Sequence, residues 1–140
     1  MVAEEQVALS SAAPSNSDPS LLVVEDEPIL LAEVVDYLRR RGEKVIGASS
    51  YAEAARILAD RSHKIEALIT DARMPDGNGI DLIRTVLDRC KDCFCILMTG
   101  HVREGGEDVD DLRNAGVKIV HKPFPPSVLH RELRSGIAKT

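Results

Sequence analysis

Polar residues that could do chemistry follow short apolar runs of this chain, at the point where each run ends. The runs lie at residues 21–24, 67–70, 94–98 and 117–120, and helix-like segments separate them. The residues that follow them are Glu25 with Asp26, Asp71, Thr99 and Lys122. Buried parallel strands have this apolar composition, and residues trailing parallel strands gather at one edge of the sheet. The pattern therefore predicts that three carboxylates, a hydroxyl and an ammonium converge.

Such a cluster has the composition of a site for a divalent cation and a phosphoryl group. Three facing carboxylates repel, which raises the proton affinity of at least one of them unless a cation compensates. Mg²⁺ suits them because it takes oxygen ligands. An aspartate beside Mg²⁺ can attack phosphorus, and Thr99 and Lys122 could offset the charge on the phosphoryl oxygens. Taken singly, Asp26 also fits a helix N-cap and Asp71 a loop residue.

Composition limits the class of protein. The chain has 140 residues with 18 Lys and Arg against 23 Asp and Glu, a net charge of -5, which disfavours direct binding to nucleic acid. No apolar run approaches membrane-spanning length, so we expect no membrane insertion and a cytoplasmic protein. Residues 1–19 lack apolar periodicity and are predicted to be a disordered tail, and residues 20–140 a single domain. The short chain favours a stand-alone domain over a fragment of a longer protein.

Three cysteines lie close together at Cys90, Cys93 and Cys95. An odd number fits reduced thiols better than a disulfide framework. Zinc would need a fourth ligand, so we interpret all three as ordinary small buried residues.

The rest of the chain predicts an α/β fold. Another short strand is expected at 44–48, and a strand precedes each of five helical segments. Pro28 suits a first helical turn, Gly42 and Gly116 suit helix ends, and Ser50 with Glu53 forms a capping-box signature. Right-handed crossovers then give a doubly wound, flavodoxin-like parallel sheet of five strands in the order 2-1-3-4-5, with helices on both faces. Residues 74–79 are rich in turn formers and predict a loop.

From Ser20 onward, the chain resembles the receiver domain of two-component response regulators, in particular single-domain regulators of the chemotaxis type. The residues that carry the resemblance are Glu25-Asp26 as the acidic pair, Asp71 as the phosphoacceptor, Met74-Pro75 with Gly79 as the following loop, Thr99-Gly100 as the switch hydroxyl, and Lys122-Pro123-Phe124 as the lysine turn.

The resemblance implies that a histidine kinase or a histidine phosphotransfer protein donates a phosphoryl group to Asp71. It also implies Mg²⁺ ligation by Asp26, by Asp71 and by the backbone carbonyl of Arg73, with Glu25 acting through water. The Lys122-Pro123 bond is commonly cis in this family. Phosphorylation would draw Thr99 and Lys122 inward and reshape the surface of the fourth helix, fifth strand and fifth helix for a downstream protein target. Such a protein is a phosphoacceptor rather than an enzyme.

Three positions depart from the family pattern or tune it. Ile119 stands where the family usually has an aromatic or histidine switch, so output is expected to depend on backbone movement. Arg73 and His101 occupy positions that influence how water reaches the phosphate. Our hypothesis is that they shield the aspartyl-phosphate; the alternative is two solvated loop side chains.

Two other functions compete. A Mg²⁺-dependent phosphatase with an aspartate nucleophile would need a second aspartate two positions after Asp71, where this chain has Arg73. A vestigial receiver that acts only as a protein-interaction module gains some support from Ile119, but the complete set of acids, Thr99 and Lys122 argues against it.

Overall fold

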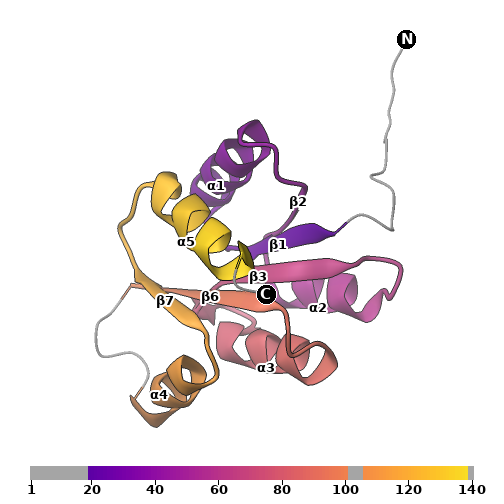
Figure 1. Cartoon of the computed structure of the whole chain (residues 1–140), viewed down its shortest axis with the longest axis vertical. Helices are drawn as coiled ribbons and strands as arrows, with labels where there is room; N and C mark the ends of the chain where they lie inside the picture. The colour runs from indigo at the N-terminus through magenta and orange to yellow at the C-terminus, as the bar shows by residue number, and fades with distance from the viewer. Residues whose placement is uncertain (1–18, 101–105, 139–140) are drawn as a thin grey trace.

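The chain folds into a parallel sheet enclosed by two layers of helices (Figure 1). The computed structural model describes residues 19–100 and 106–138. The sheet strands are β1 (Ser20–Val24), β2 (Val45–Ala48), β3 (Ile65–Asp71), β6 (Phe94–Thr99) and β7 (Lys118–His121). They pair in the order β2-β1-β3-β6-β7, which is the predicted order once the strands of this sheet are numbered along the chain. The predicted disorder of residues 1–19 concerns residues that, except for Pro19, lie outside the described part of the chain.

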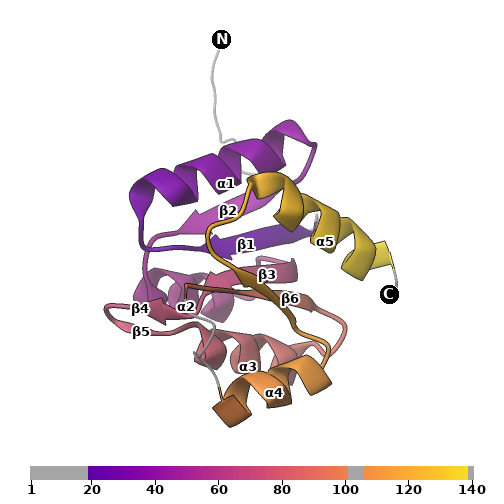
Figure 2. The same cartoon turned by 90° about the vertical axis from the view of Figure 1, so that its left-hand side faces the viewer.

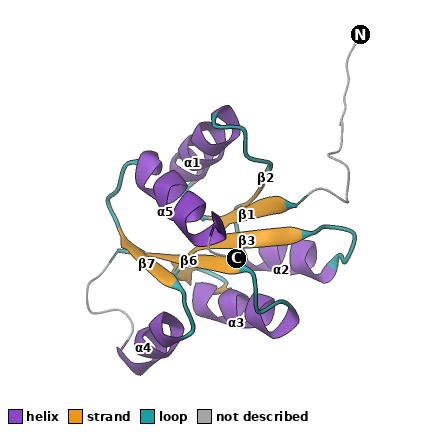
Figure 3. Ribbon diagram, viewed as in Figure 1, coloured by secondary structure: helices purple, strands orange, loops and turns teal. Residues whose placement is uncertain are grey.

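Helices cover both faces of the sheet, as predicted. They are α1 (Pro28–Arg40), α2 (Tyr51–Ala59), α3 (Gly79–Arg89), α4 (Gly106–Asn114) and α5 (Pro126–Ala138). Figures 1 and 2 show α1 and α5 on one face and α2, α3 and α4 on the other. Figure 3 shows how α1 to α4 each lie between two successive strands, whereas α5 follows the last strand. Among these helices, none is long and apolar enough to cross a membrane.

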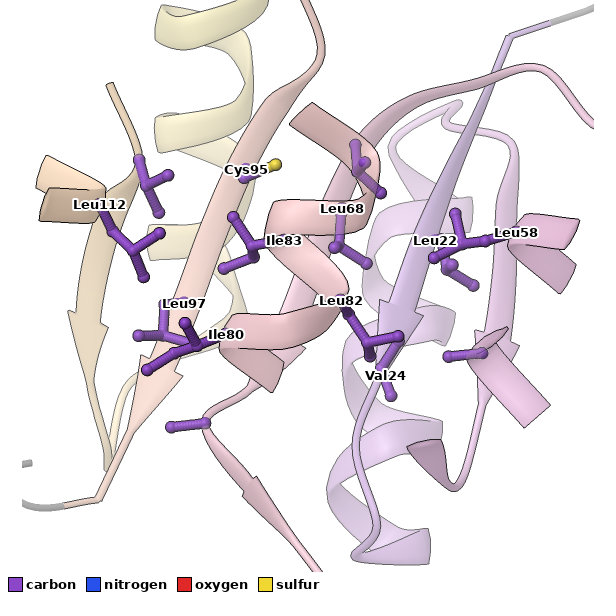
Figure 4. Packing of buried hydrophobic residues seen from close by; sticks show 14 of the residues in the cluster. Leu22, Val24, Leu58, Leu68, Ile80, Leu82, Ile83, Cys95, Leu97 and Leu112 are labelled. Carbon is purple, nitrogen blue, oxygen red and sulfur yellow. The ribbon is translucent and has the colours of Figure 1, made fainter. Parts of the chain in front are cut away.

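Alternate residues of each central strand contribute to two separate cores. In β1, Leu21 and Val23 belong to the core under α1 and α5, whereas Leu22 and Val24 belong to the core under α2, α3 and α4. Figure 4 shows this second core, where Leu82 of α3 lies near Val24. Because both faces are buried, the strand reads as an unbroken apolar run instead of an alternating one.

The ends of the helices follow the local signals in the sequence. Gly42 and Gly116 each have φ of +91°, a left-handed conformation that glycine adopts without strain, and they end the segments of α1 and α4. Ser50 caps α2, since its side chain accepts a hydrogen bond from the N–H of Glu53 at 3.1 Å. The Glu53 carboxylate accepts a hydrogen bond from the N–H of Ser49 (2.7 Å). The second bond of the capping box is therefore made one residue before the N-cap Ser50.

Two features differ from expectation. The predicted loop after β3 contains a small antiparallel pair, β4 (Arg73–Met74) and β5 (Gly77–Asn78). Cys93 and Cys95 are buried as predicted, but the prediction is wrong for Cys90, which is exposed. Cys90 is the C-cap residue of α3, where the chain turns through solvent before it enters β6.

Candidate functional site

Three carboxylates meet at the carboxyl ends of β1 and β3. Asp71 is the last residue of β3, and Glu25 and Asp26 directly follow β1, its neighbour in the sheet. One carboxylate oxygen from each of the three lies within 4.8 Å of the other two. Glu25 is fully buried and Asp71 is only 7% exposed. The strand-end pattern of the sequence therefore located the acidic cluster correctly.

Lys122 brings a positive charge into this cluster from the end of β7. Its Nζ lies 2.7 Å from Glu25 Oε1 and 3.3 Å from Asp71 Oδ2, and its side chain is 20% exposed. The backbone N–H of Lys122 donates to the carbonyl of Thr99 at 2.7 Å, which ties the lysine turn to the end of β6. The Lys122-Pro123 peptide bond is cis, as the resemblance implied.

Three of the other predicted site residues lie on β6, β4 and β7. Thr99 is buried at the end of β6, the strand next to β3, so it shares the edge that carries Asp71. Arg73 is exposed in β4, two residues past Asp71. Ile119 is partly buried in β7 and packs against the core under α2, α3 and α4. His101 lies outside the described residues.

The crowding of the acids changes the ionisation of the site. Burial raises the pKa of the Asp71 carboxyl to about 7, the charge of Glu25 acts in the same direction, and Lys122 opposes both. Burial alone lowers the pKa of the Lys122 ammonium, but the Glu25 and Asp71 carboxylates outweigh this and raise that pKa above its usual range. The Asp71 carboxyl therefore ionises less readily than an ordinary aspartate.

The residues present fit a hard divalent cation. Glu25 Oε1 is buried and has no partner with hydrogen-bond geometry among the described residues, although Lys122 Nζ lies close enough to form an ion pair. A bound cation would satisfy this oxygen and relieve the repulsion around Asp71. The donor set consists of carboxylate oxygens, which Mg²⁺ prefers over softer ligands.

Comparisons with known proteins agree with this geometry. The sequence model of the response regulator receiver domain matches residues 21–134. The chain belongs to the response regulator receiver family.

The region that matches this chain makes up different shares of the relatives' own lengths. Chemotaxis protein CheY1 of Helicobacter pylori strain J99 is 37% identical over 118 residues, which cover 81% of this chain and 92% of CheY1. The photosynthetic apparatus regulatory protein RegA of Cereibacter sphaeroides is 32% identical over 85 residues, but the match spans only 45% of RegA. A crystal structure of a response regulator receiver domain protein from Clostridium thermocellum superposes with a TM-score of 0.72 at 28% identity, covering 87% of this chain and 96% of that one.

Membership in the receiver family supports a role in phosphorylation-controlled signalling. Receiver domains are phosphoacceptors in phosphorylation-controlled signalling rather than enzymes with turnover. In this receiver domain the acidic cluster lies at the carboxyl edge of the sheet, and Lys122 Nζ forms ion pairs with both Glu25 and Asp71.

The segment after Asp71 is held against the site by close backbone contacts. The N–H of Gly79 donates to the carbonyl of Ala72 at 3.0 Å. A Cβ on Gly79 would lie 1.9 Å from the carbonyl oxygen of Asp71, so the start of α3 approaches the backbone of Asp71 more closely than any side chain permits. This contact explains the glycine that the family resemblance marks in the loop.

Sequence reasoning missed one residue that positions this segment. Asp76 accepts hydrogen bonds from the backbone N–H of Tyr51 at 2.9 Å and of Ala52 at 3.0 Å, one with each carboxylate oxygen. It therefore fastens the β4–β5 loop to the first turn of α2. Its position in a turn-rich segment was the only signal in the sequence, because its partners lie 25 and 24 residues away in the chain.

Proposed function

We propose that this receiver domain accepts a phosphoryl group on Asp71, with Mg²⁺ bound, from the phosphohistidine of a histidine kinase or of a histidine phosphotransfer protein. The observation that carries the proposal is the position of the Asp71 carboxylate, which is buried among acids and lies 3.3 Å from an ammonium group. A lone structural aspartate has no need of this environment. A nucleophile toward phosphorus needs it, because charge must be offset on the transferred group.

In the proposed transfer, an Asp71 oxygen forms a bond to phosphorus while the bond between phosphorus and the donor imidazole nitrogen breaks. The electron pair of the broken bond returns to that nitrogen. Lys122 Nζ already faces Asp71 Oδ2, so it can donate to a phosphoryl oxygen with little movement. Asp26, Asp71 and the backbone carbonyl of Arg73 would hold the Mg²⁺ directly and Glu25 would hold it through water, and the ion would add positive charge beside the phosphoryl oxygens.

The same contacts suggest how the signal leaves the site. The N–H of Lys122 is hydrogen bonded to the carbonyl of Thr99, so movement of either residue toward a phosphoryl group involves both β6 and β7. We propose that this movement shifts the population of the surface formed by α4, β7 and α5, which a downstream protein reads. Coupling free energies between such sites are typically about 1–3 kcal/mol. Ile119 cannot act as an aromatic switch, so the shift would rest on the backbone.

Arg73 and His101 enter the proposal as residues that govern the lifetime of the phosphoryl group. The exposure of Arg73, two residues past Asp71, is compatible with a guanidinium that covers the phosphate. Replacing either residue by alanine should change the rate of dephosphorylation, measured by the decay of the phosphorylated mass. Equal rates in Arg73→Ala, His101→Ala and the parent protein would leave the two as solvated loop side chains.

Phosphorylation is tested with a small phosphodonor, phosphoramidate, and intact mass spectrometry. The protein should gain the mass of one phosphoryl group with Mg²⁺ present and lose the gain in EDTA. Asp71→Asn should show no gain, whereas Glu27→Gln, which alters an exposed neighbouring acid, should behave as the parent does.

The same experiment separates the competing functions. A vestigial receiver would show no phosphorylated mass in any variant. A phosphatase would release inorganic phosphate from phosphate monoesters over many turnovers, whereas a receiver stops at one phosphoryl group on Asp71.

A further inference from the structure

We propose that Cys90 and Cys93 form a reversible intramolecular disulfide at the amino-terminal edge of the sheet, away from the phosphoryl site. Cys90 caps the carboxyl end of α3, and Cys93 precedes Phe94, the first residue of β6. Asp71, by contrast, ends its strand at the carboxyl edge. The proposal therefore does not depend on phosphorylation of the chain.

The backbone between the two cysteines already has the shape that a disulfide needs. The N–H of Cys93 donates to the carbonyl of Cys90 at 3.3 Å, which makes residues 90–93 a turn. A β-turn keeps its first and last Cα atoms within about 7 Å. Disulfides join cysteines whose Cα atoms are about 4.4–6.8 Å apart. Little backbone movement is therefore needed to bring the two sulfur atoms into bonding distance.

The two thiols have unequal access to solvent, and this sets an order of reaction. Cys90 is exposed and can meet an oxidant directly, whereas Cys93 is buried and its Sγ donates to the carbonyl of Ile65 at 3.0 Å. Burial, and after it the adjacent Cys90 thiol, raises the pKa of Cys93 to about 12. Cys90 is then the thiol that reacts with the oxidant first, and Cys93 is the thiol that attacks the resulting mixed disulfide.

Cys95 is a poor partner for either of them. It is 1% exposed and belongs to the core under α2, α3 and α4, where Figure 4 shows it beside the residues of α3. Burial raises the pKa of its thiol to about 12. The structure therefore favours one pairing, Cys90 with Cys93.

A cavity next to this pair suits a small disulfide as the oxidant. Its volume is about 430 Å³, and both Cys90 and Cys93 line it. Small-molecule sites commonly measure about 300–1,000 Å³. Arg61, Lys64 and Arg89 also line it, against the two acids Glu66 and Asp92, so its lining carries an excess of positive charge. Glutathione disulfide carries more carboxylates than ammonium groups, so its net negative charge is complementary to this lining.

The reaction balances with glutathione disulfide as the oxidant. The Cys90 sulfur bonds to one glutathione sulfur and displaces the other as a thiolate. The Cys93 sulfur then bonds to Cys90 and displaces the second glutathione thiolate. The two protons lost by the cysteines end on the two glutathione molecules, and the protein loses two electrons. The Cys93 thiol gives up its hydrogen bond to Ile65 at the start of β3 in the process.

The test incubates the reduced, folded protein with glutathione disulfide at pH 8, followed by acid quenching and alkylation. We expect the loss of two of the three alkylatable thiols. Digestion with trypsin without reduction should give the Cys90-Lys91 peptide linked to the peptide that begins at Asp92. Cys95→Ala should behave like the parent in forming the link, and Cys90→Ala, at an exposed position, should abolish it.

Several results would overturn the proposal. Three alkylatable thiols after incubation would do so, provided that the urea-unfolded protein oxidises under the same conditions. A lasting mixed disulfide between Cys90 and glutathione, or a link that involves Cys95, would also rule it out. A circular dichroism spectrum and a urea unfolding midpoint equal to those of the parent would show that Cys90→Ala is folded.

Discussion

The ammonium nitrogen of Lys122 lies 2.7 Å from the Oε1 atom of Glu25, closer than it lies to Asp71. Glu25 is fully buried, and Lys122 forms an ion pair with it. The lysine therefore compensates the charge of Glu25 at least as much as that of Asp71. A phosphoryl group on Asp71 would compete with Glu25 for the same ammonium.

Replacing Lys122 by alanine should destabilise the protein and slow its phosphorylation. A buried charge that loses its partner typically costs about 3 kcal/mol, and the loss should appear in urea unfolding in EDTA at pH 8. Lys118→Ala is the matched control, because Lys118 forms an exposed ion pair with Glu132 at 3.7 Å, and such pairs contribute below about 1 kcal/mol. Equal losses in the free energy of unfolding of the two variants would show that Lys122 does not stabilise the buried Glu25 carboxylate.

Replacing Asp71 by asparagine should stabilise the protein relative to the parent, and more so as the pH rises. The pKa of Asp71 is about 7 in the folded protein and near 3.8 when unperturbed, so the folded state binds this proton more tightly. The resulting stabilisation is fully present below about pH 4 and is lost as the pH rises through about 7. The side chain at position 71 of Asp71→Asn does not titrate, so this variant does not lose that stabilisation as the pH rises.

Urea unfolding in EDTA at pH 5 and at pH 8 tests how the stabilisation by Asp71→Asn depends on pH. The difference in free energy of unfolding between Asp71→Asn and the parent should grow by roughly 2 kcal/mol over that interval. Asp88→Asn, an exposed acid of α3, should show no such growth. A constant difference for Asp71→Asn would mean that its carboxyl ionises normally in the fold.

Mg²⁺ should raise the stability of the parent protein through the acidic cluster. A ligand that binds only the folded state stabilises it by about 2.7 kcal/mol at a free concentration about 100 times its Kd. Thermal unfolding with increasing MgCl2 should therefore shift upward in the parent and in Glu27→Gln, whose carboxyl is exposed. Asp26→Asn should weaken the shift. Identical shifts in all three would place the cation elsewhere.

The sheet and the acidic cluster were predictable from sequence, because both follow from burial and strand direction. A strand covered on both faces reads as an apolar run, and the residue that ends it must lie at the sheet edge, so Asp71 and Glu25 could be placed together without coordinates. The β4–β5 pair could not be predicted, since strands of two residues have no periodicity. The exposure of Cys90 depends on where α3 ends. The apolar run that follows in the sequence made the end of this helix hard to predict.

Removing the Asp76 carboxylate should loosen α2 and the loop that follows Asp71. Both of its oxygens accept backbone N–H groups at the start of α2, and these bonds lower the pKa of Asp76. Asp76→Ala should therefore melt at a lower temperature than Asp88→Ala at pH 7. An acid whose pKa is lowered by folding stabilises the folded state only while the acid is ionised. The difference in melting temperature between the two variants should therefore disappear as the pH drops below the ordinary pKa range of aspartate.

Adding one methyl group at Gly79 should disturb the fold and the phosphoacceptor together. The new Cβ would lie 1.9 Å from the backbone oxygen of Asp71, which cannot move aside as a side chain could. We expect a loss of about 3 kcal/mol in urea unfolding and slower labelling by phosphoramidate. Gly100→Ala is the control for stability, since a Cβ there meets nothing within 4 Å. If Gly79→Ala unfolds at the same urea concentration as Gly100→Ala, then the start of α3 is not fixed against Asp71.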